Sequence, residues 1–297
     1  NILKNIFHMK PNSPFFKKGS AKKDIEMSHN GLYRVGVIQD SDSFIRTIDI
    51  LSNYLNVEDS LKTYTFNIKK IKNKIIRDLN NLSDNDIFMI GNGSFVQYFR
   101  KEEKYETKNY DKLLISDIKL NFKNYIESDE PKDDKLLIPL LMKCSEKNDN
   151  KTFNGKVVNI LVLHETYEKK NTEIINTKIK ISEPLGGLTI RENEPILLVY
   201  KKDDYYEALM YYYNGEEYSS ISKIKDNISL KKNDVVYISD ETATILSIKN
   251  DEMKIKYDNS NASANIKVEG CIKYDMSIIY DKLIKFIHNC KSRSIRN

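Results

Sequence analysis

The apolar residues of this chain change their spacing at about residue 150. Before that point they recur at the 3.6-residue period of amphipathic helices, and after it they form short runs rich in β-branched residues. A chain that places helices first and strands afterwards is typical of an α+β fold, in which helices pack on a mostly antiparallel sheet. With 297 residues, the chain is long enough to bury a substantial core.

The first half predicts a buried helix and then a helical subdomain that reaches about residue 142. The buried helix begins after Gly36, and Asp40 or Ser41 can cap its start. Gly91-Asn92-Gly93 is expected to form a turn between two buried segments. The apolar face of the first helix comprises Phe44, Ile45, Ile48, Leu51 and Leu55, and that of a second helix comprises Phe66, Ile71, Ile75, Ile76 and Leu79.

The second half predicts a sheet. Residues 157–163 are an apolar run typical of a central strand, and residues 177–181 alternate as a half-buried strand does. Two further runs, 195–200 and 206–213, are separated by a short polar segment and predict a β-hairpin. Helices and strands together are expected to form one domain over residues 31–228.

Residues 229–297 predict a smaller region that follows this domain. Its short strands and polar turns are typical of a small curled barrel of the Tudor or chromo-like kind, or of a β-meander. The expected strands are 235–238, 243–248, 254–257 and 265–268, and the expected closing helix carries Ile278, Ile279, Leu283, Phe286 and Ile287. Residues 1–30, which contain Pro11 and Pro14, predict an extended lead-in, and the start at Asn1 predicts a segment of a longer protein.

Composition argues against several classes of function. The 48 basic and 43 acidic residues are interspersed and leave a net charge of +5, so nucleic acid is not the favoured partner. No apolar run approaches the ~20 residues that span a membrane. Three widely spaced cysteines, Cys144, Cys271 and Cys290, predict neither a disulfide framework nor a metal site, and they indicate a reducing compartment. We expect no cofactor, because Gly186-Gly187 lacks the Lys-Ser/Thr that completes a phosphate loop.

Residues 37–46 have the pattern of a catalytic loop that leads into a buried helix. Papain-like enzymes place their nucleophile at the N-terminus of such a helix, where backbone N–H groups stabilise a thiolate. The residues from Asp40 to Arg46 resemble the Asp-x-x-Cys motif of OTU-type (ovarian tumour) deubiquitinases, with Ser43 in the place of the cysteine. The base of that family is a His just after an apolar strand. Here the strand 197–200 leads to Tyr205-Tyr206-Glu207, with Tyr205 in the place of the His.

This resemblance implies an OTU-like, papain-like cysteine-protease scaffold that has lost its catalytic pair. A serine hydroxyl is a poor nucleophile without an adjacent base. Tyrosine, with a reference pKa near ~10, stays protonated at neutral pH and cannot replace imidazole. Asp40, Ser43 and Tyr205 are therefore degenerate catalytic positions, and we expect no enzyme activity. Tyr205, Tyr206 and Glu207 are the predicted binding residues, since tyrosine-rich faces are common at protein interfaces.

A second resemblance covers about residues 10–215. In order, its segments are Pro11-Asn12-Ser13 with Phe15-Phe16, residues 33–39, Ser43-Phe44, residues 92–96 with Phe99, residues 122–126, Gly155, residues 159–163 and residues 197–207. Together they resemble a protein family of nucleocytoplasmic large DNA viruses, which is associated with the large subunit of the poxvirus-type early transcription factor. The resemblance implies a protein of the virion or of the viral factory in the host cytoplasm. Its partners would be other viral proteins, a ubiquitin-like protein or RNA polymerase machinery.

Two alternatives remain open at this point. One is an active OTU-type cysteine protease with a rearranged dyad of Cys144 and His164, which requires the two side chains to lie within hydrogen-bond reach. The other is a nucleic-acid-binding module that uses residues 230–297 and their basic tail.

Overall fold

The computed structural model describes residues 31–55, 66–100, 110–170, 173–213 and 216–221, and most of 232–294 apart from residues 234, 239–240, 250–251, 259, 261, 268–271 and 274–275. These residues divide into two compact units, a larger one from Tyr33 to Ser220 and a smaller one that comprises residues 31–32 and the residues from Ile221 onward. The predicted lead-in, the predicted boundary at residue 228 and Cys271 lie outside the described residues.

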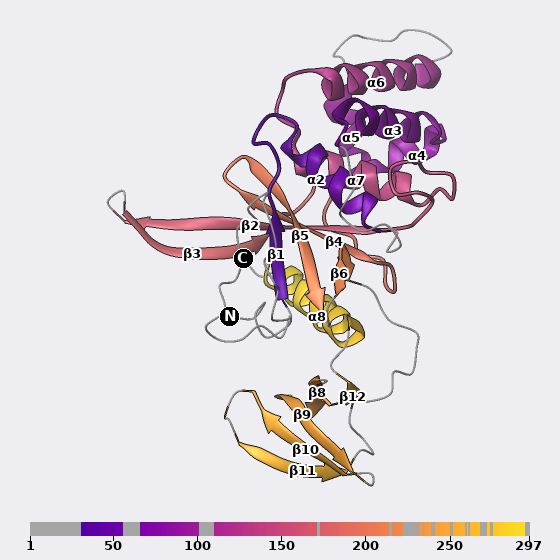
Figure 1. Ribbon diagram of the computed structural model, residues 1–297. Coiled ribbons are helices and arrows are strands. Elements are labelled where there is room, and N and C mark those ends of the chain that lie inside the picture. Colours follow the sequence, from indigo (N-terminus) through magenta and orange to yellow (C-terminus); the bar gives the residue numbers. More distant parts are fainter. Residues whose placement is uncertain are drawn as a thin grey trace. The chain divides into compact units, whose positions relative to one another are not determined.

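The larger unit is a layer of helices on one face of a β-sheet (Figure 1). The helices are α2 (Ser43–Asn53), α3 (Ile68–Asn80), α4 (Asp84–Met89), α5 (Ser94–Phe99), α6 (Tyr110–Glu127) and α7 (Asp134–Ser145). The strands are β1 (Gly31–Val35), β2 (Asn159–Lys170), β3 (Glu173–Ile181), β4 (Ile196–Lys202), β5 (Tyr205–Tyr213), β6 (Glu216–Tyr218) and β7 (Ser220–Ile221). The predicted α+β class is therefore confirmed.

The sheet of the larger unit is mixed, which the sequence analysis did not predict. Its strand order is β1-β5-β4-β2-β3, with β6 beside β5 and β7 beside β4. The hairpins β4–β5 and β2–β3 are antiparallel, whereas β2 and β4 run parallel. The parallel pair arises because β3 carries the chain back before β4 begins. Beyond Glu165, β2 pairs with β3 alone, and the two strands form a ribbon that extends away from the sheet (Figure 1).

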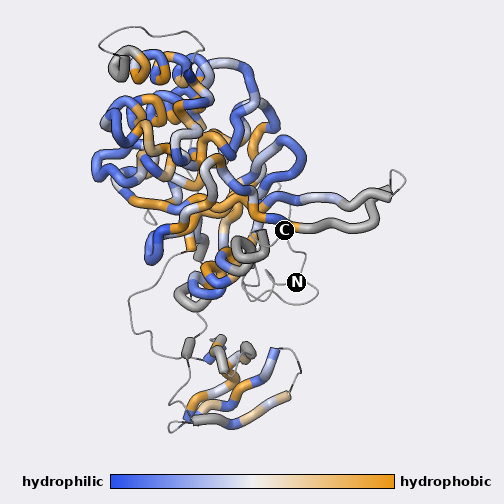
Figure 2. Tube along the Cα trace, turned by 180° about the vertical axis from the view of Figure 1, so that it is seen from behind, coloured by the Kyte–Doolittle hydropathy of each residue, from blue (hydrophilic) through white to orange (hydrophobic). Residues whose placement is uncertain are grey.

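The core of this unit lies between the helices and the sheet, where apolar segments gather (Figure 2). All five apolar residues predicted for the first helix face are buried, and they belong to this core. Alternate residues of β5, namely Tyr206, Ala208 and Met210, meet them from the sheet, because successive side chains of a strand point to opposite faces. The buried helix and the hairpin are therefore predicted correctly, and they pack on each other.

Two glycine turns hold the chain between β3 and β4 against the helical layer. Gly91 has a φ of 55° and Gly186 a φ of 82°, a region that favours glycine. A Cβ on Gly186 would collide with the carbonyl oxygen of Gly91, and one on Gly91 would lie 2.8 Å from that of Leu185. The Asn92 side-chain amide donates a hydrogen bond to the Gly186 carbonyl at 2.8 Å. The predicted turn at 91–93 is thus in backbone contact with the Gly186-Gly187 segment.

The smaller unit contains a five-stranded sheet and a long helix. Its elements are β8 (Val235–Ile238), β9 (Glu241–Lys249), β10 (Glu252–Tyr257), β11 (Ser263–Lys267), β12 (Ile272–Lys273) and α8 (Met276–Ser294). The order β11-β10-β9-β8-β12 is a meander with one added strand, so the barrel prediction is wrong and its meander alternative is confirmed. Among the described residues β11 and β12 do not pair, and a two-residue β12 offers few ladder hydrogen bonds for closure.

Alternate residues of the small sheet form its core, which consists of Val236, Ala243, Ile245, Met253 and Ile255. The predicted closing helix is present as α8, with Ile279, Leu283 and Ile287 buried along one face. In the part of the chain that the structure describes, no helix combines the length and apolar character needed to cross a membrane.

Candidate functional site

Ser43, at the predicted nucleophile position, is the first residue of α2 and is 1% exposed. The N-cap residue is Asp42, whose side chain makes no capping hydrogen bond, so the predicted cap by Asp40 or Ser41 is wrong. Asp40 instead organises the preceding loop: its carboxylate accepts a hydrogen bond from the Asp42 N–H at 3.0 Å and pairs with Arg46 at 2.6 Å. Burial opposes ionisation, but Arg46 outweighs it and lowers the pKa of Asp40.

Ion pairs within the fold fill the space around this helix start. The Asp42 carboxylate lies 2.7 Å from the ammonium of Lys72 and 3.8 Å from that of Lys132. The Lys132 backbone N–H also donates to the Ser41 carbonyl at 2.9 Å, and its buried ammonium donates to the Ser128 carbonyl at 2.7 Å. The loop is therefore fastened to α3 and to the segment before α7.

Tyr205, at the predicted base position, points away from α2. Its side chain is 41% exposed, whereas that of Tyr206 is 5% exposed, because neighbouring residues of β5 face opposite sides of the sheet. It is Tyr206 that reaches α2, with its ring edge-on to Phe44 at a centroid distance of 5.1 Å. In the described part of the chain no hydrogen bond joins Ser43 to Tyr205. The structure does not bring the two degenerate positions together.

A buried carboxylate that the sequence analysis missed holds Tyr206 in place. Asp134, the first residue of α7, is fully buried and accepts hydrogen bonds from Ser182 at 2.6 Å, Lys201 at 2.7 Å and Tyr206 at 2.7 Å. Burial opposes its ionisation, but these three donors outweigh burial and lower the pKa of Asp134. Burial, followed by the charge of Asp134, raises the pKa of the Tyr206 hydroxyl. This cluster ties the helical layer to the sheet.

His164 and Cys144 lie near opposite ends of α7. His164 pairs in register with Lys201, and its charged neighbours include Asp134 at the start of the helix. Cys144 stands ten residues further along, which is ~15 Å of helix rise. Burial raises the pKa of the Cys144 thiol well above its usual value, with Asp78 as the next cause. This placement does not support a rearranged Cys144–His164 dyad.

A pocket of about 250 Å³ opens on the other face of the hairpin, away from the helices. It is lined by Arg34, Gln39, Tyr200, Lys202, Asp203, Tyr205 and Glu207, and we call it the hairpin pocket. Two of the three predicted binding residues, Tyr205 and Glu207, therefore line one site, while Tyr206 lies on the opposite face.

The walls of the hairpin pocket are held by charged and aromatic contacts. Arg34 pairs with Glu207 at 3.0 Å, and its guanidinium lies 4.8 Å from the centroid of the Tyr200 ring. Gln39 comes from the loop that resembles a catalytic loop. This loop and the hairpin thus line one pocket together, although Ser43 does not line it.

Comparison of the chain with protein-family models, curated proteins and solved structures finds no significant match. Within the described ranges, no group of three or more His, Cys, Asp or Glu side chains is placed to hold a metal ion. The function therefore has to be argued from the geometry of this chain.

Proposed function

We propose that the larger unit is a non-catalytic, OTU-like interaction module of a large-DNA-virus protein, which acts in a virion or early-transcription assembly. The separation of Ser43 from Tyr205 carries the non-catalytic part of this proposal, and the resemblance of residues 40–46 to the OTU motif carries the OTU-like part. Gln39 and Tyr205 line an open pocket, while Ser43 is buried outside it. A surface of this kind can bind a partner without turning it over.

The surroundings of Ser43 support the absence of catalysis. A serine nucleophile needs a base within about 2.6–3.2 Å and an open path to its substrate. Ser43 is almost fully covered, and the nearby side chains Asp40 and Asp42 are engaged with Arg46 and Lys72. Their carboxylates stabilise the loop and are not available to activate a hydroxyl.

The chemistry of the hairpin pocket suits a segment of polypeptide. Tyr205 offers aromatic surface, Gln39 offers an amide, and Lys202 and Glu207 carry opposite charges. Aromatic side chains and arginine are enriched at protein interfaces, and a polar rim supplies specificity. Other viral proteins, a ubiquitin-like protein and RNA polymerase machinery are the partners to test.

A first experiment tests the absence of catalysis. The protein is incubated with ubiquitin that carries an electrophile at its C-terminus, beside an active OTU-type deubiquitinase as a positive control. We expect no covalent adduct with the wild type or with Ser43→Ala. An adduct that forms with the wild type and is lost in Ser43→Ala would overturn the non-catalytic proposal.

A second experiment tests the binding surface. A photo-crosslinking phenylalanine analogue is placed at Tyr205, at Gln39 or, as a control, at Tyr98, which is 57% exposed. In infected cells, Tyr205 and Gln39 should give an adduct with the same polypeptide, identified by mass spectrometry, and Tyr98 should not. Equal adduct yields at all three positions, or none at either pocket position, would refute a partner in the hairpin pocket.

A further inference from the structure

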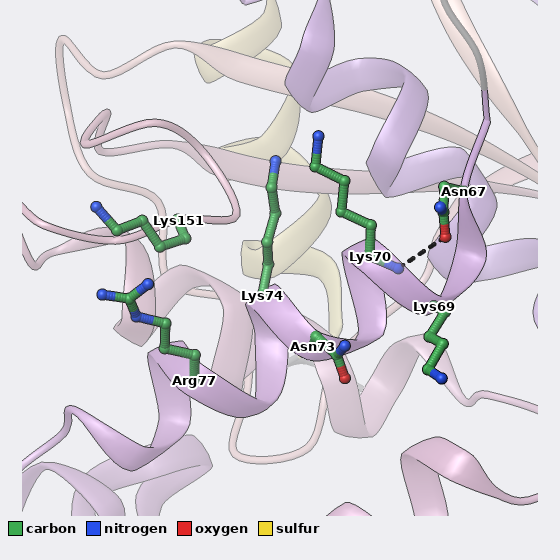
Figure 3. Close-up of a pocket in the computed structure, with 7 residues that line it drawn as sticks. All are labelled: Asn67, Lys69, Lys70, Asn73, Lys74, Arg77 and Lys151. Carbon is green, nitrogen blue, oxygen red and sulfur yellow. Dashed lines mark hydrogen bonds between the residues drawn. The ribbon is translucent and has the colours of Figure 1, made fainter.

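Helix α3 carries a cationic groove that is unrelated to the hairpin pocket. Its volume is about 450 Å³, and it is lined by Asn67, Lys69, Lys70, Asn73, Lys74, Arg77 and Lys151 (Figure 3). We call it the α3 groove. The lining holds cations and amides but neither a carboxylate nor an aromatic ring.

The α3 groove brings together five cations, Lys69, Lys70, Lys74, Arg77 and Lys151. Lys72 on the same helix pairs with Asp42 at 2.7 Å, and Lys143 pairs with Asp86 at 3.0 Å. Within the described ranges, none of the five groove cations forms an ion pair. Lys123, Lys135 and Lys180 are also exposed and form no ion pair among the described residues, but they are spread over α6, α7 and β3, whereas five cations line the α3 groove together.

The carboxylate that acts electrostatically on Lys70 and Lys74 is Asp49, which is 5% exposed and does not line the groove. Burial raises the pKa of Asp49 to about 6, against the opposing effects of Asn53 and the two lysines. Asp49 is thus buried away from the groove lining and forms no ion pair with Lys70 or Lys74 among the described residues, so the two ammonium groups can bind an external anion.

The far end of the α3 groove is fixed by a buried carboxylate on the same helix. Asp78 is 3% exposed and accepts hydrogen bonds from the backbone N–H groups of Lys151, at 2.7 Å, and Thr152, at 2.8 Å. This anchor places Lys151 beside Arg77 although the two residues are far apart in the sequence (Figure 3). The groove is therefore pre-formed by the fold.

The cations lie in a row. Lys70, Lys74 and Arg77 follow the i, i+4, i+7 spacing of one helix face, and Lys70 and Lys74 project to the same side in Figure 3. With a helix rise of ~1.5 Å per residue, Lys70 and Arg77 are ~10 Å apart along the axis. Phosphates on one strand of a duplex advance ~3.4 Å per nucleotide along its axis, so the row matches about three of them.

We propose that the α3 groove binds the phosphate backbone of double-stranded nucleic acid, independently of sequence. The row of cations fits an extended polyanion better than a single phosphate, which requires donors that converge on one point. Binding of single strands usually relies on aromatic rings on which bases stack, and the groove lining has none. Contacts to phosphates position a protein on a duplex without reading its bases.

The test is fluorescence anisotropy of a labelled 20-base-pair DNA duplex at salt concentrations from 50 to 200 mM. The groove variant combines Lys70→Gln, Lys74→Gln and Arg77→Gln, and the control variant combines Lys123→Gln, Lys135→Gln and Lys180→Gln at exposed positions elsewhere. Both variants lose the same charge and keep side chains of similar length. Circular dichroism checks that each has the wild-type fold.

Each phosphate contact contributes about 0.9 to the slope of log K against log salt, so the groove variant should have a slope less steep by about 3 and bind at least about tenfold more weakly. The control variant should stay close to the wild type, and two duplexes of unrelated sequence should bind within about twofold of each other. Equal losses in both variants would overturn the proposal. So would absence of wild-type binding at 50 mM salt, or tighter binding of a single strand or of polyglutamate than of the duplex.

Discussion

Removing the Tyr206 hydroxyl, with the substitution Tyr206→Phe, tests whether the Asp134 cluster stabilises the larger unit. The phenyl ring keeps its contact with Phe44, so the change removes the hydrogen bond that the hydroxyl donates to the buried Asp134 carboxylate at 2.7 Å and the longer one that it accepts from the Asp134 N–H at 3.4 Å. A hydrogen bond to a charged group contributes about 1.5–3 kcal/mol. For a domain of roughly 150–250 residues, Tm falls ~2–4 °C per kcal/mol, so we expect a loss of ~3–12 °C.

The matched control is Tyr205→Phe, which removes the neighbouring hydroxyl on the exposed face and should change the free energy of unfolding by less than about 0.5 kcal/mol. Urea titrations followed by circular dichroism measure both variants. The pKa of Asp134 is lower in the folded state than the unfolded value of about 3.9. The ionised carboxylate therefore stabilises the fold above that pH, and this stabilisation is lost as the pH falls below it. Equal stability of the two variants at pH 7 would show that the hydrogen bond from Tyr206 to Asp134 does not stabilise the contact between the helical layer and the sheet.

Three further predictions concern single positions in the larger unit. Gly186→Ala should destabilise it by more than about 1 kcal/mol in a urea titration, because the new Cβ meets the Gly91 carbonyl at a positive φ; an unchanged midpoint would contradict this backbone contact. Asp49→Asn should stabilise it by ~1–3 kcal/mol at pH 7.5 and have little effect near pH 4. Burial raises the pKa of Asp49 to about 6, so stability falls as the pH rises from about 4 to 6, and a pH-independent difference would count against this. Asp78→Ala should cost about 2–5 kcal/mol and expose the Lys151 and Thr152 amides to hydrogen exchange, whereas retained protection would show that Asp78 does not anchor them.

The parts of the fold that the sequence predicted are those with a local signal. The face of α2 is marked by apolar residues at helical spacing, and the turn at Gly91 by glycine and asparagine. The hairpin was visible as two apolar runs with a short polar segment between them. Each of these signals depends on residues close together in the chain, and each is found in the structure.

The parts that the sequence did not predict depend on long-range pairing. Asp134 meets Tyr206, which lies 72 positions further along the chain, and no local pattern marks either residue as a partner. The choice between a barrel and an open sheet depends on whether β11 and β12 pair, which strand spacing does not determine. Lys151 lies at the α3 groove because its backbone N–H donates to Asp78 on α3. The periodicity of α3 alone could not predict it as a lining residue.

At the candidate site, the sequence motif also failed to predict which of two neighbouring side chains faces the helix. Alignment to a motif selected Tyr205, yet strand alternation turns Tyr205 outward and Tyr206 inward. A motif fixes the order of residues in the chain, while the pleat decides which of two neighbours faces the helix. The loop before Ser43 is likewise held by the Lys132 N–H, which donates to the Ser41 carbonyl and lies far from the motif in sequence.

The opposite orientations of Tyr205 and Tyr206 also constrain how this hairpin can evolve. Gaining or losing a single residue within β5 would move every later side chain to the other face, and would bring polar groups into the core. Substitution at an outward position such as Tyr205 leaves the core untouched. Related proteins should therefore keep the length of β5 fixed, while the outward residues of β5 can change with the binding partner without disturbing the core.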